Sequence, residues 1–304
     1  MSTLLTILFA WLGVNLLHAA WVGTRRRLWE RRFTRDVDGL LPGAAEYVVG
    51  QGPVALLFIH GFADTPRIWR RIADRLAANG AFTCRAMRLP GSAEPARRAR
   101  HQSLEGWRAK VDAEVDGLRS THAAVWVVGH SLGGALALDA ALRTPDRISG
   151  VAVLAPMLRI SRRRSPLLPP GAWFALARVT LCLSPTFESC FSAVMAAVDD
   201  PGFTFLRDKF IPFSVYHGLF QLMRALRGQA GRVACPVFAV TSESDSVVDT
   251  PAALRWLEGC RVPKEIHART DIAHVVPLEM GWHTLADALA AFVRESSAAG
   301  RGRE

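Results

Sequence analysis

Cysteine is scarce in this sequence, and the patterns that would hold a metal ion or cross-link a small fold are missing. An odd number of scattered cysteines without any CxxC spacing argues against a zinc site and against a disulfide framework. Small buried thiols in a reducing compartment are the simpler interpretation. The five cysteines are Cys84, Cys182, Cys190, Cys235 and Cys260.

Nucleic-acid-binding motifs are missing too, although a net charge of +10 would suit a polyanionic partner. The chain has neither the Cys/His spacing of a zinc finger nor an aromatic RNP-like run, so we expect no nucleic acid as a partner. Nearly all of the positive charge is arginine. Much of it lies in two clusters, Arg25–Arg27 with Arg31, Arg32 and Arg35, and Arg159 with Arg162–Arg164. The second cluster is either a solvated face or a contact for phosphate head groups.

What is present is a globular composition. Of the 304 residues, 50% are hydrophobic and 21% charged, which excludes a disordered chain and a multi-span membrane protein. The length allows one sizeable core with an insertion, or two small domains.

One long apolar run, Leu4–Gly23, opens the chain and is long enough to cross a bilayer as a helix. We predict a transmembrane anchor over residues 1–24 and an arginine-rich linker over 25–43. Because the arginines follow the run, the catalytic domain should be cytoplasmic and the protein single-pass. A cleaved signal peptide, which would make the protein secreted or periplasmic, and an interfacial or buried helix remain alternatives.

The rest of the chain alternates apolar strand-like runs with amphipathic segments. Strands are expected over 44–49, 54–61, 82–91, 124–131, 148–156, 236–245 and 264–269, and helices over 66–79, 103–120, 132–144, 251–259 and 281–295. This alternation predicts an α/β fold with a doubly wound, mostly parallel sheet. Residues 157–233 break the rhythm and predict a helical cap inserted between core segments 44–156 and 234–296. Residues 297–304 are predicted to be a disordered tail.

The strongest chemical signal is Gly129-His130-Ser131-Leu132-Gly133, a G-x-S-x-G placed between a buried strand and a helix of small residues. A serine on such a sharp turn has a strained backbone, and its neighbours two residues away come too close for side chains. Ser131 is therefore the predicted nucleophile.

The same turn supplies one oxyanion donor, the backbone N–H of Leu132 at the start of the helix. The second donor is expected from the loop after strand 54–61, and we assign it to the backbone N–H of Phe62. His60 in this loop is interpreted as a structural residue that orients it.

A serine nucleophile needs a base and an orienting acid. Among the histidines that follow Ser131, only His274 lies in the loop after the last strand, so it is the predicted base; His217, His267 and His283 lie in the cap, a strand and a helix. For the acid, the segment after strand 236–245 offers Asp245, Asp249 and Glu243. Asp245 is favoured because Asp249 or Thr250 is expected to cap the next helix.

Taken together, these residues resemble the α/β-hydrolase superfamily, within it the bacterial carboxylesterase and monoacylglycerol lipase branch. The resemblance covers residues 44–296 and rests on HGF at 60–62, GHSLGG at 129–134, SESDSVVD at 242–249 and AHVVPLE at 273–279. It implies Ser131, Asp245 and His274 as triad, and Phe62 and Leu132 as oxyanion donors. Two features depart from the family: Leu89-Pro90-Gly91-Ser92 lacks the His or Tyr and the second Gly common in this turn, and the cap has no close match.

These residues together predict a serine hydrolase that cleaves carboxylic esters through an acyl-enzyme, without metal or cofactor. The cap is rich in aromatic residues that would bury it against the core or line an apolar acyl pocket, which favours a lipid or other small-molecule ester. They are Trp173, Phe174, Phe187, Phe191, Phe203, Phe205, Phe210, Phe213 and Phe220. A thioesterase, amidase, lactonase or acyltransferase would use the same triad. A catalytically inactive, membrane-tethered binding protein is the alternative of another class.

Overall fold

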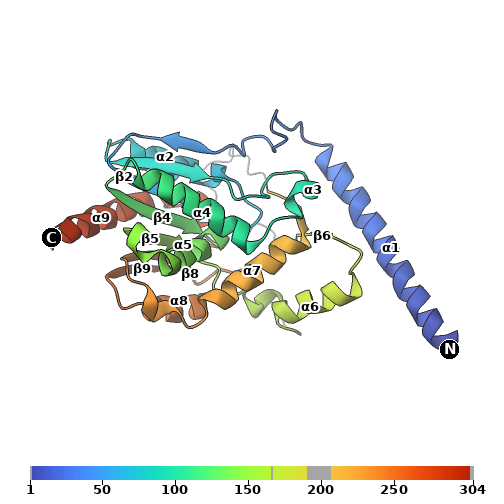
Figure 1. The fold of residues 1–304 in the computed structure, drawn as a ribbon. Helices are drawn as coiled ribbons and strands as arrows, with labels where there is room; N and C mark the ends of the chain where they lie inside the picture. Colours follow the sequence, from blue (N-terminus) through green and yellow to red (C-terminus); the bar gives the residue numbers. More distant parts are fainter. Residues whose placement is uncertain (1, 166, 190–206, 302–304) are drawn as a thin grey trace.

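A seven-stranded β-sheet forms the centre of the structure (Figure 1), a computed structural model that describes residues 2–165, 167–189 and 207–301. The strands lie in the order β1-β3-β2-β4-β5-β8-β9. Only β1 is antiparallel to its neighbour, and all other pairs are parallel. The strands are β1 (Tyr47–Val49), β2 (Val54–Ile59), β3 (Phe82–Met87), β4 (Ala124–His130), β5 (Gly150–Leu154), β8 (Val237–Ser242) and β9 (Lys264–Arg269).

Helices cover both faces of this sheet, as they must when parallel strands are joined by crossovers. Helices α2 (Arg70–Ala77) and α9 (Trp282–Arg301) pack on one face, and α4 (Leu104–Arg119), α5 (Leu132–Arg143), α7 (Phe213–Leu226) and α8 (Thr250–Glu258) pack on the other. The short helix α3 (Ala96–Ala99) and the 3-10 turns η1 (Pro66–Trp69), η2 (Pro145–Arg147), η3 (Arg162–Arg164), η4 (Ala230–Arg232) and η5 (Val276–Leu278) lie in the connections.

Strand β2 shows why the apolar runs in the sequence are unbroken. Leu56 and Phe58 pack with α2 and α9, whereas Leu57 and Ile59 pack with the helices on the other face. Successive side chains point to opposite sides of a strand, so a strand covered on both faces must be apolar at every position. The doubly wound sheet predicted from the sequence is therefore confirmed.

The insertion between β5 and β8 contains helices α6 (Pro170–Thr180) and α7, as expected of a helical cap. It also contains a small antiparallel pair, β6 (Thr186–Glu188) with β7 (Phe210–Pro212), which the sequence did not predict. Each strand has three residues, too few to show a period of two. Three of the cap aromatics, Phe191, Phe203 and Phe205, lie outside the described residues.

Two helices extend beyond their predicted ends. Helix α1 (Ser2–Glu30) continues through Arg25–Arg27, so the first part of the predicted linker is helical. Helix α9 continues to Arg301, which contradicts a disordered tail over residues 297–301; residues 302–304 lie outside the described part. Arginine and alanine both favour helix, and neither segment contains proline to stop it.

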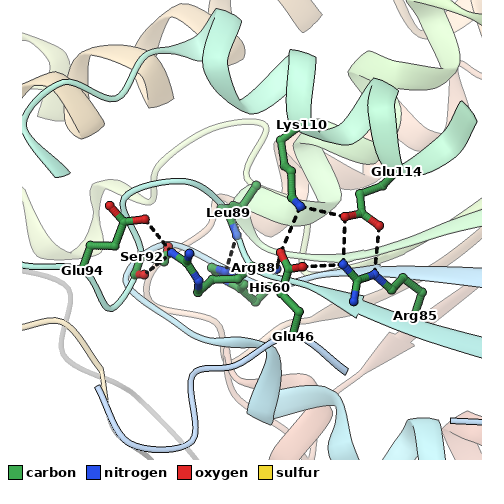
Figure 2. A network of polar contacts seen from close by, with 9 residues as sticks. All are labelled: Glu46, His60, Arg85, Arg88, Leu89, Ser92, Glu94, Lys110 and Glu114. Atoms are coloured by element: carbon green, nitrogen blue, oxygen red, sulfur yellow. Dashed lines mark hydrogen bonds and ion pairs between the residues drawn. The ribbon is translucent and has the colours of Figure 1, made fainter. Parts of the chain in front are cut away.

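The edge of the sheet is tied to helix α4 by a network of charged groups (Figure 2). Arg85 on β3 contacts Glu114 of α4 through its Nε at 2.9 Å and also pairs with Glu46, just before β1. Lys110 of α4 contacts Glu114 at 2.7 Å and Glu46 at 3.2 Å. Burial raises the pKa of Glu114, but Arg85 and Lys110 outweigh this effect and bring it to about 2.

The lowered pKa of Glu114 predicts that this residue contributes to stability in a pH-dependent way. Glu114→Gln should lower the free energy of unfolding by about 1–3 kcal/mol at neutral pH. A carboxyl group whose pKa is lowered in the folded state stabilises the fold fully at pH values above its unfolded-state pKa of 4.5. This stabilisation is lost as the pH falls from 4.5 towards the folded-state pKa of about 2. The difference in the free energy of unfolding between wild type and variant, measured by urea unfolding in neutral detergent, should therefore become smaller below pH 4.5. Glu105→Gln, whose side chain is 72% exposed, is the control and should change little; a pH-independent difference would contradict the assignment.

Candidate active site

Ser131 sits on the turn between β4 and α5 in a conformation that few residues adopt. Its φ of 53° and ψ of −113° place it in a strained region of the backbone map. Two backbone bonds support it: its N–H donates to Leu154 O at 2.9 Å, and its carbonyl accepts from Met157 N at 2.9 Å. Both partners lie at the end of β5 or just after it, so the neighbouring strand holds the turn.

The flanking glycines are required by space, as the sequence predicted. A Cβ on Gly129 would lie 2.2 Å from Gly133 O, and a Cβ on Gly133 would lie 2.1 Å from Ile59 O. The second contact brings the start of α5 against the end of β2, where the His60-Gly61-Phe62 segment begins. The glycine therefore sets the distance between the nucleophile turn and the predicted oxyanion loop.

His274 connects Ser131 with Asp245 in a continuous chain of hydrogen bonds. Its Nε2 lies 3.1 Å from Ser131 Oγ, and its Nδ1 lies 2.7 Å from Asp245 Oδ2. All three side chains are buried. The other carboxylate oxygen of Asp245 accepts from Val247 N at 2.7 Å and Val248 N at 2.9 Å. The structure thus brings together the three residues that the sequence selected from distant segments.

Electrostatics suit His274 to act as a base. Burial lowers the pKa of His274 below its ordinary value, while the bond to Asp245 opposes the shift. Burial alone would raise the pKa of Asp245, but His274 and the two N–H donors outweigh it and lower it. At neutral pH the imidazole is therefore neutral and Asp245 is ionised. Since Asp245 accepts from Nδ1–H, Nε2 is left with its lone pair towards the serine hydroxyl.

The alternative acids occupy other positions. Asp249 accepts from Ala252 N at 3.0 Å as the N-cap of α8, and it pairs with Arg159. Glu243 is exposed. The remaining histidines also lie elsewhere: His267 on β9 contacts Glu265, and His283 is exposed at the start of α9.

The loop that carries His274 is held by two residues whose roles the sequence analysis did not recognise. Buried Glu279 accepts from Ala273 N at 2.6 Å and from Val275 N at 3.1 Å, on both sides of the histidine. His130 donates from Nε2 to His274 O at 2.8 Å. Both residues lie inside quoted motifs, but their function depends on backbone groups that no sequence pattern reveals.

The predicted oxyanion loop is fixed by a neutral histidine. Leu89 N–H donates to His60 Nε2 at 3.0 Å, so the proton is on Nδ1, which donates to Gly61 O at 2.9 Å. Burial lowers the pKa of His60 to about 4, which keeps this tautomer uncharged at neutral pH. The geometry agrees with the structural role expected for His60.

Arg207 reaches the same loop from the cap and was missed by the sequence analysis. Its Nη2 donates to Phe62 O at 2.8 Å, and its Nε lies 2.6 Å from buried Asp64. Burial would raise the pKa of Asp64, but Arg207 and His130 outweigh it and bring it to about 2. One arginine among many carries no sequence signal; only the fold shows that it bridges cap and loop.

A small pocket opens at the serine. It is lined by Phe62, Ser131, Met157, Arg207, Leu219, Val247 and His274. Leu132 follows Ser131 at the first position of α5. Of the two residues predicted as oxyanion donors, Phe62 therefore lines the pocket with Ser131, and Leu132 is next to Ser131 in the chain. No group of three or more metal-ligating side chains that could hold an ion occurs within the described residues.

Comparison with known proteins gives the family. A model of the family described as serine aminopeptidase, S33 (Hydrolase_4) matches residues 53–281. The chain belongs to this family. The thermostable monoacylglycerol lipase of Bacillus sp. (strain H-257) is 25% identical over 241 residues, which are 79% of this chain and 90% of that protein.

Solved structures of two relatives share the fold of this family member. One, described with the metagenome-derived lipolytic enzymes LipS and LipT, has a TM-score of 0.73 at 22% identity and covers 84% of this chain and 99% of its own. The monoacylglycerol lipase of Paleococcus ferrophilus has a TM-score of 0.68 at 21% identity and covers 83% and 98%. The protein is thus an α/β hydrolase similar to the monoacylglycerol lipase branch, as its motifs predicted.

The lowered pKa of His274 predicts the acid limb of the rate profile. A base must be neutral, so kcat/KM for a p-nitrophenyl ester should stay level as the pH falls from 8 and decline only below 6.5, with unit slope. Steady-state rates across this range, with unfolding followed in parallel by fluorescence, check it. A limb centred well above 6.5 would contradict a buried imidazole as the base.

Proposed function

We propose that this α/β hydrolase cleaves carboxylic esters, with Ser131 as nucleophile, His274 as base and Asp245 as orienting acid. The observation that carries the proposal is the chain of contacts from Ser131 Oγ to His274 Nε2, at 3.1 Å, and from His274 Nδ1 to Asp245, at 2.7 Å. Strain at the nucleophile and burial of both partners support the same assignment.

In the proposed reaction His274 removes the Ser131 proton while the oxygen attacks the acyl carbonyl. The negative charge that develops on the carbonyl oxygen is held by the N–H groups of Phe62 and Leu132. Asp245 holds the imidazole tautomer and stabilises its protonated form. His274 then protonates the leaving alcohol, and a water molecule activated by the same histidine hydrolyses the acyl-enzyme.

An ester with an apolar acyl group is the preferred substrate class. Met157, Leu219 and Val247 line the pocket beside Ser131, and the cap aromatics Phe174 and Phe213 stack with ring centroids 4.3 Å apart. The monoacylglycerol lipase of Bacillus sp. supports an acyl ester as well. A thioesterase, amidase or acyltransferase would use the same groups, and a panel of acyl donors and acceptors separates them. An inactive binding protein is disfavoured because all three members of the triad are in contact.

Ser131→Ala should reduce hydrolysis of p-nitrophenyl butyrate by at least about 10⁴-fold and abolish labelling by a fluorophosphonate probe. Asp245→Asn keeps an oxygen for Val247 N–H but loses the charge and the correct tautomer, so kcat should fall by about 10⁴-fold. Asp249→Asn is the matched control, because asparagine also caps a helix, and should leave the rate nearly unchanged. Full activity of Ser131→Ala, with circular dichroism confirming the fold, would refute the proposal.

We also propose that α1 is retained and attaches the enzyme to a membrane. By length and composition α1 could cross a bilayer: an 18-residue window has a mean hydropathy of 1.7, and 11% of it is buried. Two of its polar residues, Asn15 and His18, contact the cap. Asn15 Nδ2 donates to Thr180 O at 2.7 Å, Asn15 Oδ1 accepts from Leu183 N at 3.3 Å, and His18 Nδ1 lies 2.6 Å from Ser184 Oγ. Removal of α1 as a signal peptide would break these bonds.

These contacts place the cap beside the middle of α1. Asn15 precedes Arg25 by about 15 Å along the helix axis, so the end of α6 meets α1 part-way along its apolar run. The arginine flank supports a single-pass anchor with a cytoplasmic catalytic domain.

The full chain should stay with membranes after an alkaline carbonate wash, and a variant without residues 2–24 should be released. Asn15→Leu should remain membrane-bound, because the helix becomes more apolar although its bonds to the cap are lost. Mass spectrometry of the mature N-terminus provides the decisive control. A chain that begins near residue 20 would identify a signal peptide and overturn the anchor.

A further inference from the structure

The cap contains a second, much larger opening than the pocket at Ser131. It is a cleft of about 1210 Å³ between helices α6, α7 and α8 and the segment that follows β5. Its lining includes five arginines and a histidine, namely Arg159, Arg162, Arg178, Arg224, Arg227 and His217. No acidic residue occurs among the described residues that line it. The cleft therefore presents a strongly positive rim.

These arginines differ from several arginines of the core that have carboxylate partners. Arg108 and Arg143 share Asp139, Arg75 pairs with Asp287 and Arg147 pairs with Asp116. In the cleft Arg159 pairs with Asp249 at 3.3 Å. Arg178, Arg224 and Arg227 are exposed, and no carboxylate of the described residues pairs with them. Their uncompensated charge favours an anionic ligand.

Between the arginines the cleft is apolar. Phe174 of α6 and Phe220 of α7 pack with ring centroids 4.9 Å apart, and Ile160, Met223 and Trp256 complete this surface. The Trp256 indole N–H already donates to Leu226 O, so its ring serves as apolar surface. A ligand that fits both features carries an acyl chain and an anionic group in one molecule.

The cleft lies next to the reaction pocket. Leu158 lines the cleft and Met157 lines the pocket, where the Met157 N–H also donates to Ser131 O. One aromatic ring links the two sides: Tyr216 packs 6.2 Å from Phe174 in the cleft and 5.0 Å from Phe62 in the pocket, between ring centroids. The cleft and the pocket therefore adjoin each other along the Met157–Leu158 segment and Tyr216.

We propose that this cleft binds the phosphate-bearing part of an acyl ester lipid, with the phosphate against Arg178, Arg224 and Arg227 and the carbons that join it to the ester against Phe174 and Phe220. Arginine is suited to the task because its fork of N–H donors matches the geometry of a phosphate. The inference deepens the proposed ester hydrolase by naming an anionic lipid as its substrate class.

The test compares two esters that differ only by a phosphate group, 1-octanoylglycerol and 1-octanoylglycerol 3-phosphate, hydrolysed by the full chain in neutral detergent. Replacing Arg178 and Arg227 together with glutamine should raise KM for the phosphate ester about tenfold and leave KM for the neutral ester within about twofold. The wild-type preference should also fall with added NaCl, because exposed charges are screened. The control Arg255→Gln with Arg261→Gln removes two exposed charges outside the cleft lining and should change neither KM.

A further experiment adds inorganic phosphate, at the same concentration as the phosphate ester, as a competitor of its hydrolysis. Inorganic phosphate should not compete, because it has no acyl chain and gains only solvent-screened contacts with the arginines. Competition as strong as that of the ester would instead identify the cleft as a site for free phosphate and overturn the lipid assignment. Equal KM values for both esters in wild type and variant, with full fluorophosphonate labelling, would refute the cleft's role and leave the hydrolase intact. If the wild-type protein hydrolyses neither ester and is not labelled by the fluorophosphonate probe, the proposed hydrolase activity itself would be refuted.

Discussion

The close approach of backbone around Ser131 is the constraint on which the site depends. The start of α5 packs against the ends of β2 and β4 at distances that leave no room for a Cβ on Gly129 or Gly133. Ser131 is held at a positive φ by bonds to Leu154 and Met157, so strain at one residue is balanced by the surrounding sheet. The serine hydroxyl is thereby held towards His274.

Buried charges in the core position these loops. Glu279 binds backbone N–H groups on either side of His274, and Asp245 binds two others while it orients the imidazole. Asp64 and Arg207 pair beside the Phe62 segment. A buried carboxylate is costly unless it is fully bonded, and each of these three has cationic or N–H partners. The loops are thereby given one conformation, and Arg207 makes the cap part of the arrangement.

Charge is distributed unevenly between core and cap. Several core arginines are matched by carboxylates, as in the network that ties Arg85 to Glu46 and Glu114 at the sheet edge. The cap combines unmatched arginines with exposed apolar residues on α6, and α1 lies alongside it (Figure 1). Exposed apolar residues and unmatched arginines thus occur together in the cap.

The sequence by itself determined the sheet, the nucleophile turn and the three side chains that meet there. Strands buried on both faces need unbroken apolar runs, and the turn needs its glycines. Its position in the loop after the last strand distinguished His274 from the other histidines that follow Ser131. Asp245 was favoured over Asp249 because a helix-capping residue can be recognised locally, and the structure shows Asp249 in that role.

Only the tertiary structure decided what depends on backbone groups and on segments distant in the chain. Glu279, His130 and Arg207 contact main-chain atoms, Asn15 meets a cap residue 165 positions away, and the arginines of the cleft come from separate helices. Side-chain patterns encode which face of an element is buried, but they do not encode which loop, helix or unpaired charge will be its neighbour.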